Sequence, residues 1–301
     1  MLSTVITGRT YTSRPMTQED VEVVDDLISQ SLLAVGAETL RMNFHTSPGG
    51  FTVVVDENNQ IVAMEGHNDM SNGLRFSAKV YVKPKLRCRG MFGLFPGPGQ
   101  IGIATTSFIR KLNRPVVFKH KYLVYWGKPH LEAIDSFLES AACRMERIDS
   151  ENATDVIEYD TLILPGIKRD SYIREWCVPT KYGIKTVGLV AYDIKGGVCG
   201  YGVAKETNLV VHFSPLYAET ATIARQLYIG LLKLSRDILG VEEVCLYGFA
   251  GCRLISELAL TLGLESVTTE MLWIRSDPEI VEFIQNIQFD KVYGVFDFWP
   301  V

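Results

Sequence analysis

Residues 74–90, LRFSAKVYVKPKLRCRG, join an alternating β-type segment to a basic turn that ends in glycine. The alternation predicts a strand up to Val82, and the proline after it stops the strand because proline cannot donate a ladder hydrogen bond. A glycine- and proline-rich run follows, and the spacing beyond it predicts a helix over 101–112. Main-chain N–H groups of such a turn, with the positive end of a helix behind them, can bind a pyrophosphate. Arg87 and Arg89 would add charge-assisted hydrogen bonds, and the alternative is an ordinary basic surface loop.

The segments around this stretch alternate between strand and helix patterns. Thr17, with Asp20 three residues later, is typical of a helix N-cap ahead of an amphipathic run. Two β-rich runs flank the turn-forming residues 56–59 and indicate a hairpin. In the first half, strands are therefore expected over 10–16, 51–55, 61–64, 74–82 and 116–126, and helices from 17 onward and over 101–112 and 129–142.

The second half repeats this order without repeating the letters, which is a weak sign of duplication. Strands are expected over 156–164, 186–192, 198–204, 209–213, 243–247, 266–274 and 292–298, and helices over 169–176, 215–239, 254–262 and 278–287. A polar, acidic stretch at 149–155 separates the halves. We therefore expect an α/β protein of two domains, 1–150 and 151–301, each with a mixed, mostly antiparallel sheet flanked by helices.

Composition narrows the classes of function. The 301 residues carry a net charge of −5 and a pI near 5.6, so the charge does not favour nucleic acid as a partner. No apolar run reaches the ~18 residues of a membrane span, and the N-terminus does not resemble a secretory leader. The six cysteines show no CxxC pair and no short Cys/His spacing, which argues against a zinc site or a disulfide framework. We expect a cytoplasmic protein without a metal or a membrane partner, and a homodimer stays open.

Five motifs stand in a characteristic order. The run from Thr10 to Asp20 comes first, followed by Val82-x-Pro84-x-x-Arg87-x-x-Gly90. These two resemble the first strand with its helix start, and the fourth strand with its pyrophosphate signature, of the GNAT superfamily of acyl-CoA N-acyltransferases. The second-half segments are similar to the C-terminal domain of the tandem YitH-like acetyltransferases; they are residues 214–219, 262–264 and 271–273. The likeness extends over roughly residues 10–275, and the order of the motifs is more specific than any one of them.

The resemblance implies an N-acetyltransferase that uses acetyl-CoA (coenzyme A) as co-substrate. A small primary amine, such as an arylalkylamine, a polyamine or an amino acid, would attack the thioester directly, without a covalent enzyme intermediate or a metal. Val80 and Val82 would face the pantetheine arm. The phosphates would lie on the turn and on the start of the next helix; the residues implied are Arg87, Cys88, Arg89, Gly90 and Gly102.

The sequence departs from the family pattern at two places: the phosphate-binding loop and the residue that acts as general acid. Phe92 stands where the signature has glycine or alanine, and a second register at 99–104 lacks the leading arginine or glutamine. The tyrosine acid that is common in the superfamily aligns with Phe137 in the first half and Ala259 in the second, so it is missing from both. The candidates for a catalytic base or proton relay are Glu65, His67 and Tyr81.

These departures leave a second function open. Glu219 would lie where phosphate binds in the second half, and its charge would repel an anion, so we expect that half to support or shape the site. The alternative to an enzyme is a catalytically inactive protein of this fold that binds acyl-CoA or a small ligand as a sensor or scaffold.

Overall fold

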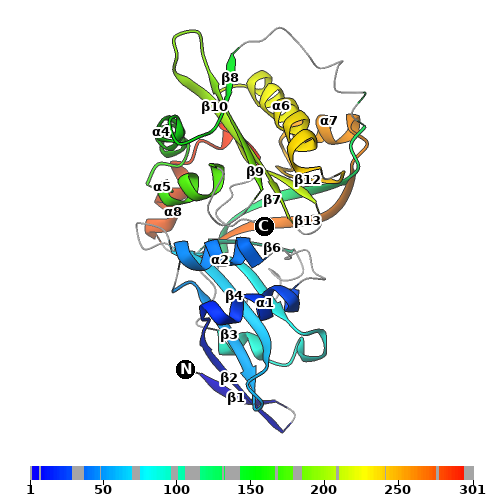
Figure 1. The fold of residues 1–301 in the computed structure, drawn as a ribbon. Helices are drawn as coiled ribbons and strands as arrows, with labels where there is room; N and C mark the ends of the chain where they lie inside the picture. The colour runs from blue at the N-terminus through cyan, green and yellow to red at the C-terminus, as the bar shows by residue number, and fades with distance from the viewer. Residues whose placement is uncertain are drawn as a thin grey trace. The chain divides into compact units, whose positions relative to one another are not determined.

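The computed structural model divides the chain into two compact units, which we call unit 1 (residues 1–102 and 298–301) and unit 2 (residues 103–297) (Figure 1). The structure describes residues 2–6, 8–28, 37–47, 49–69, 75–95, 101–105, 116–130, 132, 143–166, 169–178, 185–207, 210–240, 242–275 and 278–294. Within these ranges, every helix is too short or too polar to cross a membrane.

Unit 1 contains strands in the order β1-β2-β3-β4-β5, followed by β6, whose first two residues belong to unit 1. Neighbours from β1 to β5 are antiparallel, whereas β5 and β6 run parallel. The strands are β1 (Ser3–Ile6), β2 (Arg9–Pro15), β3 (Phe51–Asp56), β4 (Ile61–Asp69), β5 (Arg75–Val82) and β6 (Ile101–Thr105). The helical segments are η1 (Gln18–Asp20), α1 (Val21–Ile28), α2 (Ala37–Thr46), η2 (Pro84–Leu86) and η3 (Met91–Leu94).

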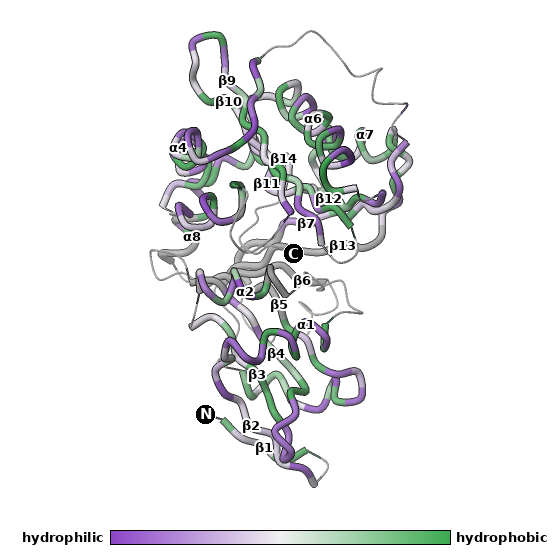
Figure 2. Tube along the Cα trace, in the orientation of Figure 1, coloured by the Kyte–Doolittle hydropathy of each residue, from purple (hydrophilic) through white to green (hydrophobic). Residues whose placement is uncertain are grey.

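Two hydrophobic clusters cover opposite faces of this sheet, because successive side chains of a strand point to opposite sides. Val53 and Val55 belong to the cluster that contains residues of α1 and α2, and Val54 belongs to the cluster with η2 and η3. Figure 2 shows β3 as largely hydrophobic, in agreement with its sequence FTVVVD.

Local signals predicted the start of the first helix and the hairpin correctly. The Thr17 N–H donates to Asp20 Oδ2 at 2.8 Å, which confirms the cap. The carboxylate of Asp56 accepts the N–H groups of Asn58 and Gln60, both at 3.0 Å, and so closes the turn between β3 and β4.

Unit 2 has the strand order β13-β7-β12-β11-β10-β9-β8, with β14 paired to β11. β11 and β12 are parallel, and the other described pairs are antiparallel. The strands are β7 (Val116–Gly127), β8 (Arg144–Arg147), β9 (Thr186–Tyr192), β10 (Val198–Glu206), β11 (Val211–Ala218), β12 (Val244–Phe249), β13 (Glu265–Arg275) and β14 (Val292–Gly294). The helical segments are α4 (Ala153–Ile163), α5 (Asp170–Tyr172), η5 (Ile173–Cys177), α6 (Ala221–Leu239), α7 (Arg253–Thr261), α8 (Pro278–Gln285) and η6 (Phe289–Lys291).

Helices α6 and α4 pack on opposite faces of the unit 2 sheet (Figure 1). Helix α6 lies close to β10 because this strand carries glycines: a Cβ on Gly202 would lie only 2.9 Å from Leu231 Cδ1 of α6. The neighbouring Tyr201 points the other way, toward α4, where its hydroxyl donates to Asp160. Hydrophobic and polar residues interleave along α6 in Figure 2, as the spacing of an amphipathic helix requires.

The structure corrects three predictions of element type. Residues 156–163 belong to helix α4 and are not a strand, because burial recurs there every three or four residues, and that period outweighs the β-branched composition. Pro215 does not start a helix; it lies in β11 at a bulge, where a strand tolerates proline. Residues 101–105 are strand β6 and not a helix, since their alternating, partly β-branched sequence pairs with β5. The rest of that predicted helix, 106–112, lies outside the described residues.

The units divide the chain at a different place from the expected boundary near residue 150. Strand β7 lies between β12 and β13, and β8 pairs with β9. Strands from both sides of residue 150 therefore belong to one sheet in unit 2. The helix expected over 129–142 falls almost entirely outside the described residues, as does the end of the strand expected over 292–298.

Candidate functional site

In unit 1, β5 pairs with its two neighbours over very different lengths. Its pairing with β4 runs the whole length of the strand, from Arg75 to Val82. Its parallel pairing with β6 includes only Phe76 and Ser77 among the described residues. Among the described residues the β5–β6 ladder ends at Ser77, and we call the stretch of β5 beyond it, with the turn that follows, the unit 1 fork. The edge of β5 that faces the fork includes Val80 and Val82, the residues predicted to lie along pantetheine.

A β-bulge lies at the same point of β5. Gly66 of β4 pairs with Lys79, but the next residue, His67, pairs with Ser77, so Ala78 is the extra residue on β5. A bulge leaves its extra residue outside the ladder and increases the local bend of its strand. It therefore accounts for the divergence of β5 from β6 directly after Ser77.

The turn after β5 is fastened to the sheet by apolar side chains and presents basic ones. Buried residues of η2 and η3 pack in one cluster with Val80 and Val82; they are Leu86, Met91, Leu94 and Phe95. Arg87, Cys88, Arg89 and Gly90 are exposed between them, and the Arg87 Nε donates to the Val82 carbonyl at 3.0 Å. Cys88 and Gly90 both have positive φ, +61° and +83°, which turns the chain sharply at the end of the strand.

The predicted helix tip is not part of this arrangement. Gly102 lies inside strand β6, opposite Ser77, and so does not start a helix. The described segment that follows Gly90 is η3, whose four residues are too few to produce a substantial helix dipole. Positive charge at this turn therefore comes from the arginine and lysine side chains.

The three candidate bases lie on β4 and β5 close to the bulge, but not on one face. Tyr81 pairs with Met64, and both pack in the cluster of α1 and α2. Glu65 pairs with Val80, which packs on the opposite face beside η2 and η3. Glu65 and His67 stand two apart on one strand and so share that face, and both are buried, at 0% and 2% exposure. The pair therefore lies on the face that the basic turn covers.

Unit 2 contains a second fork of the same construction. Strand β11 pairs with β12 only at Val211, His212 and Phe213. A bulge follows, in which one residue of β10 faces Ser214 and Pro215 of β11. In this fork, however, β11 pairs with β14 beyond the bulge.

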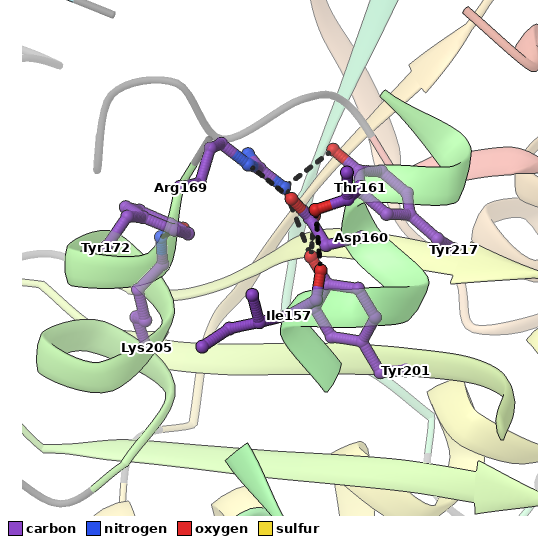
Figure 3. Close-up of polar contacts among 8 residues, drawn as sticks. All are labelled: Ile157, Asp160, Thr161, Arg169, Tyr172, Tyr201, Lys205 and Tyr217. Carbon is purple, nitrogen blue, oxygen red and sulfur yellow. Dashed lines mark hydrogen bonds and ion pairs between the residues drawn. The ribbon is translucent and has the colours of Figure 1, made fainter. Parts of the chain in front are cut away.

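A buried polar network in unit 2 joins α4, the start of α5, β10 and β11 (Figure 3). The sequence analysis did not predict this network. Arg169 donates to both carboxylate oxygens of Asp160, with the Nε bond at 3.0 Å. The same guanidinium donates to the hydroxyls of Tyr201 at 3.1 Å and Tyr217 at 3.3 Å. The neighbouring Asp160 carboxylate holds the pKa of Arg169 above its usual range despite the burial. The available signals were a charged residue inside an apolar helical period and a lysine inside an apolar strand.

That lysine, Lys205, lies beside the network and is 1% exposed. Burial lowers its pKa to about 7, and the nearby Arg169 charge acts in the same direction. Its Nζ donates to the Tyr172 hydroxyl at 3.5 Å. Burial also raises the pKa of the neighbouring Cys177 thiol to about 12, so this cysteine is a neutral core residue.

No protein-family model matches the sequence, and no curated protein is significantly similar to it. Among solved structures, a proposed acetyltransferase from Pyrococcus horikoshii is similar, with a TM-score of 0.65 and 14% identity over 96% of this chain and 95% of that one. A tandem GNAT protein from the clavulanic acid biosynthesis pathway has a TM-score of 0.60 at 13% identity, over 87% of this chain and 97% of that one. This chain has the tandem GNAT fold.

Within this GNAT fold, each half contains one bulged strand at the fork, β5 in the first half and β11 in the second. This repeat is not visible in the sequences of the two halves, because they are dissimilar. The structure places Ala259, where the sequence lacks the expected tyrosine acid, in the buried side of α7. Phe137, its counterpart in the first half, lies outside the described residues. His212 is buried on β11 and stacks on Tyr247 with ring centroids 5.5 Å apart, so it is a core residue of unit 2.

Proposed function

We propose that this protein is an acyl-CoA-dependent N-acetyltransferase whose cofactor site is the unit 1 fork. The observation that carries the proposal is the divergence of β5 from β6 after Ser77, with the basic turn directly at the end of β5. A strand edge that has lost its neighbour offers N–H and C=O groups in a row, and an extended chain with amide groups can pair with such a row. The pantetheine arm of acetyl-CoA is an extended chain of this kind.

The basic turn supplies the complement to the diphosphate of coenzyme A. Arg87 and Arg89 are exposed, and a guanidinium forms strong charge-assisted hydrogen bonds to phosphate. The main-chain N–H groups of Cys88 and Gly90 would add to this site. The donor set therefore fits a phosphorylated thioester better than an uncharged ligand.

Bound acetyl-CoA would supply an activated acyl group, and the residues of this chain would orient it and remove a proton. The nitrogen of a neutral primary amine forms the new C–N bond at the thioester carbonyl, the C–S bond breaks, and the thiolate that leaves takes up a proton. Glu65 fits the role of base best, because it lies across from Val80 on β5, and His67 follows it on the same face. Tyr81, on the other face, is the alternative. Holding the amine against the thioester supplies much of the acceleration in such a direct transfer.

The first experiment measures cofactor binding as a shift of the melting temperature with acetyl-CoA. A ligand that binds only the folded state at 100 times its Kd stabilises it by ~2.7 kcal/mol. We expect the shift in the wild type and its loss in the double variant Arg87→Ala, Arg89→Ala. The matched control removes two exposed arginines of unit 2, Arg236 and Arg253, and should keep the shift. An equal shift in all three proteins would contradict the proposed site.

A second experiment distinguishes an enzyme from a non-catalytic binding protein. The second function is tested because the tyrosine acid common in the superfamily is missing from both halves. Release of free thiol from acetyl-CoA is followed across arylalkylamines, polyamines and amino acids. Turnover above the rate without protein supports the transferase. A thermal shift without any thiol release would instead identify a sensor or scaffold.

A further inference from the structure

The two forks raise the question of how many acyl-CoA molecules one chain binds. In both units a strand bears a bulge and then leaves its parallel neighbour, β5 after Ser77 and β11 after Phe213. In unit 2 the fork also leads directly to the N-terminus of the 19-residue helix α6, whose N-cap is Thr220. On strand geometry and helix dipole alone, unit 2 would be the better phosphate site.

The unit 2 fork, however, is occupied by the chain itself. Strand β14 pairs with β11 at Leu216 and Tyr217, through Gly294 and Val292, and also lies against β12. Val292 and Gly294 are buried. Beyond the bulge, β14 thus takes the hydrogen-bonding edge of β11, whereas the corresponding edge of β5 pairs with β6 only at Phe76 and Ser77 among the described residues.

The fit of β14 against β11 is too close for a side chain at Gly294. A Cβ on this residue would lie 2.8 Å from the Leu216 Cβ and 2.9 Å from the Leu216 nitrogen. Glycine is therefore required there, as expected where two main chains are pressed together. Tyr293, between the paired residues, packs against the hydrophobic core of unit 2.

The charged side chain at the N-terminus of α6 also has its partner within the same chain. Glu219 immediately precedes the N-cap of α6, and Lys291 immediately precedes β14. The Lys291 Nζ lies 2.8 Å from Glu219 Oε2. The carboxylate thus stands at the helix N-terminus, where a phosphate would be attracted, and a lysine of the β14 segment pairs with it.

The segment that leads into β14 is fastened to α4. The Gln288 N–H donates to the Ile163 carbonyl at 3.1 Å, and the Gln288 side-chain amide donates to the Leu162 carbonyl. Together with the Lys291–Glu219 pair, these bonds hold the approach to β14 on unit 2. They favour a permanent strand over a strap that leaves when a ligand arrives.

We propose that β14 is a built-in occupant of the unit 2 fork, standing where pantetheine would lie, and that it leaves the chain with a single acyl-CoA site, in unit 1. The statement about unit 1 rests on the function proposed above, whereas the occupation of the unit 2 fork does not. Unit 2 then serves as a supporting lobe with no cofactor of its own.

The first test combines the stoichiometry of coenzyme A binding with amide hydrogen exchange on the full chain. We expect one coenzyme A per chain by calorimetry. Exchange should slow about tenfold in peptides that cover residues 78–90 and stay unchanged in those that cover 214–218 and 292–294. Two molecules per chain, or a ligand-dependent change at 214–218, would overturn the proposal. Failure of coenzyme A to bind at all would refute the function of unit 1 and leave the occupation of unit 2 to the second test.

The second test dislodges β14 without any ligand. Gly294→Val places a branched side chain against Leu216 and should speed exchange at 214–218 about tenfold. The matched control is Gly251→Val, where a Cβ would meet no atom within 4 Å, and it should leave that exchange as in the wild type. Lys291→Ala, which adds no bulk, should speed the same exchange by a smaller factor. Wild-type exchange at 214–218 in both Gly294→Val and Lys291→Ala would show that β14 does not hold this edge.

Discussion

Loss of Arg169 should destabilise unit 2 far more than loss of an exposed basic residue. The side chains of Arg169 and Asp160 are 5% and 1% exposed, and the guanidinium also donates to two tyrosine hydroxyls. Arg169→Met would leave the Asp160 carboxylate buried without its cation. Breaking a buried ion pair by removing one partner typically costs ~3–5 kcal/mol, because the remaining charge stays desolvated.

The assay is urea unfolding of each variant, followed by circular dichroism, with the midpoint and slope of each transition compared. The control is Lys128→Met, which removes an ion pair to Glu242 of 2.6 Å between side chains 67% and 74% exposed, and should leave the unfolding midpoint almost unchanged because water screens the pair. The double variant Asp160→Leu, Arg169→Met should recover most of the loss, since no buried charge remains. Equal costs for Arg169→Met and Lys128→Met would refute the reasoning.

Three further predictions concern proton transfer and pH. Glu65→Gln should lower kcat by about 10²-fold or more and leave the affinity for coenzyme A unchanged, whereas Tyr81→Phe should have a smaller effect in steady-state kinetics; the reverse order would assign the base to Tyr81. The folded pKa of Lys205, about 7, lies below the ordinary 10.5, so the unfolded chain binds this proton more tightly. Lys205→Met should therefore raise the free energy of unfolding most below pH 7, and a gain that does not shrink toward pH 10.5 in chemical denaturation would contradict this. The hydrogen bond from Arg14 lowers the pKa of Asp20 below 3.8, so Asp20→Asn should destabilise unit 1 at pH 7, and its melting temperature should converge with that of the wild type as the pH falls through the folded pKa.

Most helices and strands followed from signals within a few residues. The helix expected over 254–262 is α7, and Gly263, with φ of +73°, follows it in the left-handed region that glycine readily adopts at a helix end. The hairpin at 56–59 was visible for the same reason, since its carboxylate bonds to N–H groups two and four residues on. The prediction failed where two local signals competed: β-branched residues suggested a strand over 156–164, while the burial period required a helix.

The candidate site was less accessible to sequence reasoning. The basic turn at 87–90 could be located because proline and glycine delimit it. The position of Gly102 could not be predicted, because a short alternating segment becomes a strand only if another strand offers it an edge, and that edge is β5. Lys205 and Asp160 stand among apolar residues in the sequence, but whether each is buried and which groups it pairs with depend on what packs against them.

The amino-acid sequence by itself determined most of the strands and helices, several of their caps and turns, and a basic corner at the end of a strand, since each of these depends on neighbours along the chain. Only the tertiary structure decided which edges are shared: β7 lies between β12 and β13, and β14 lies on the free edge of β11. The physical reason is that every strand carries the same main-chain N–H and C=O groups, whatever its side chains are. The choice of partner is made by packing between residues that are far apart in sequence.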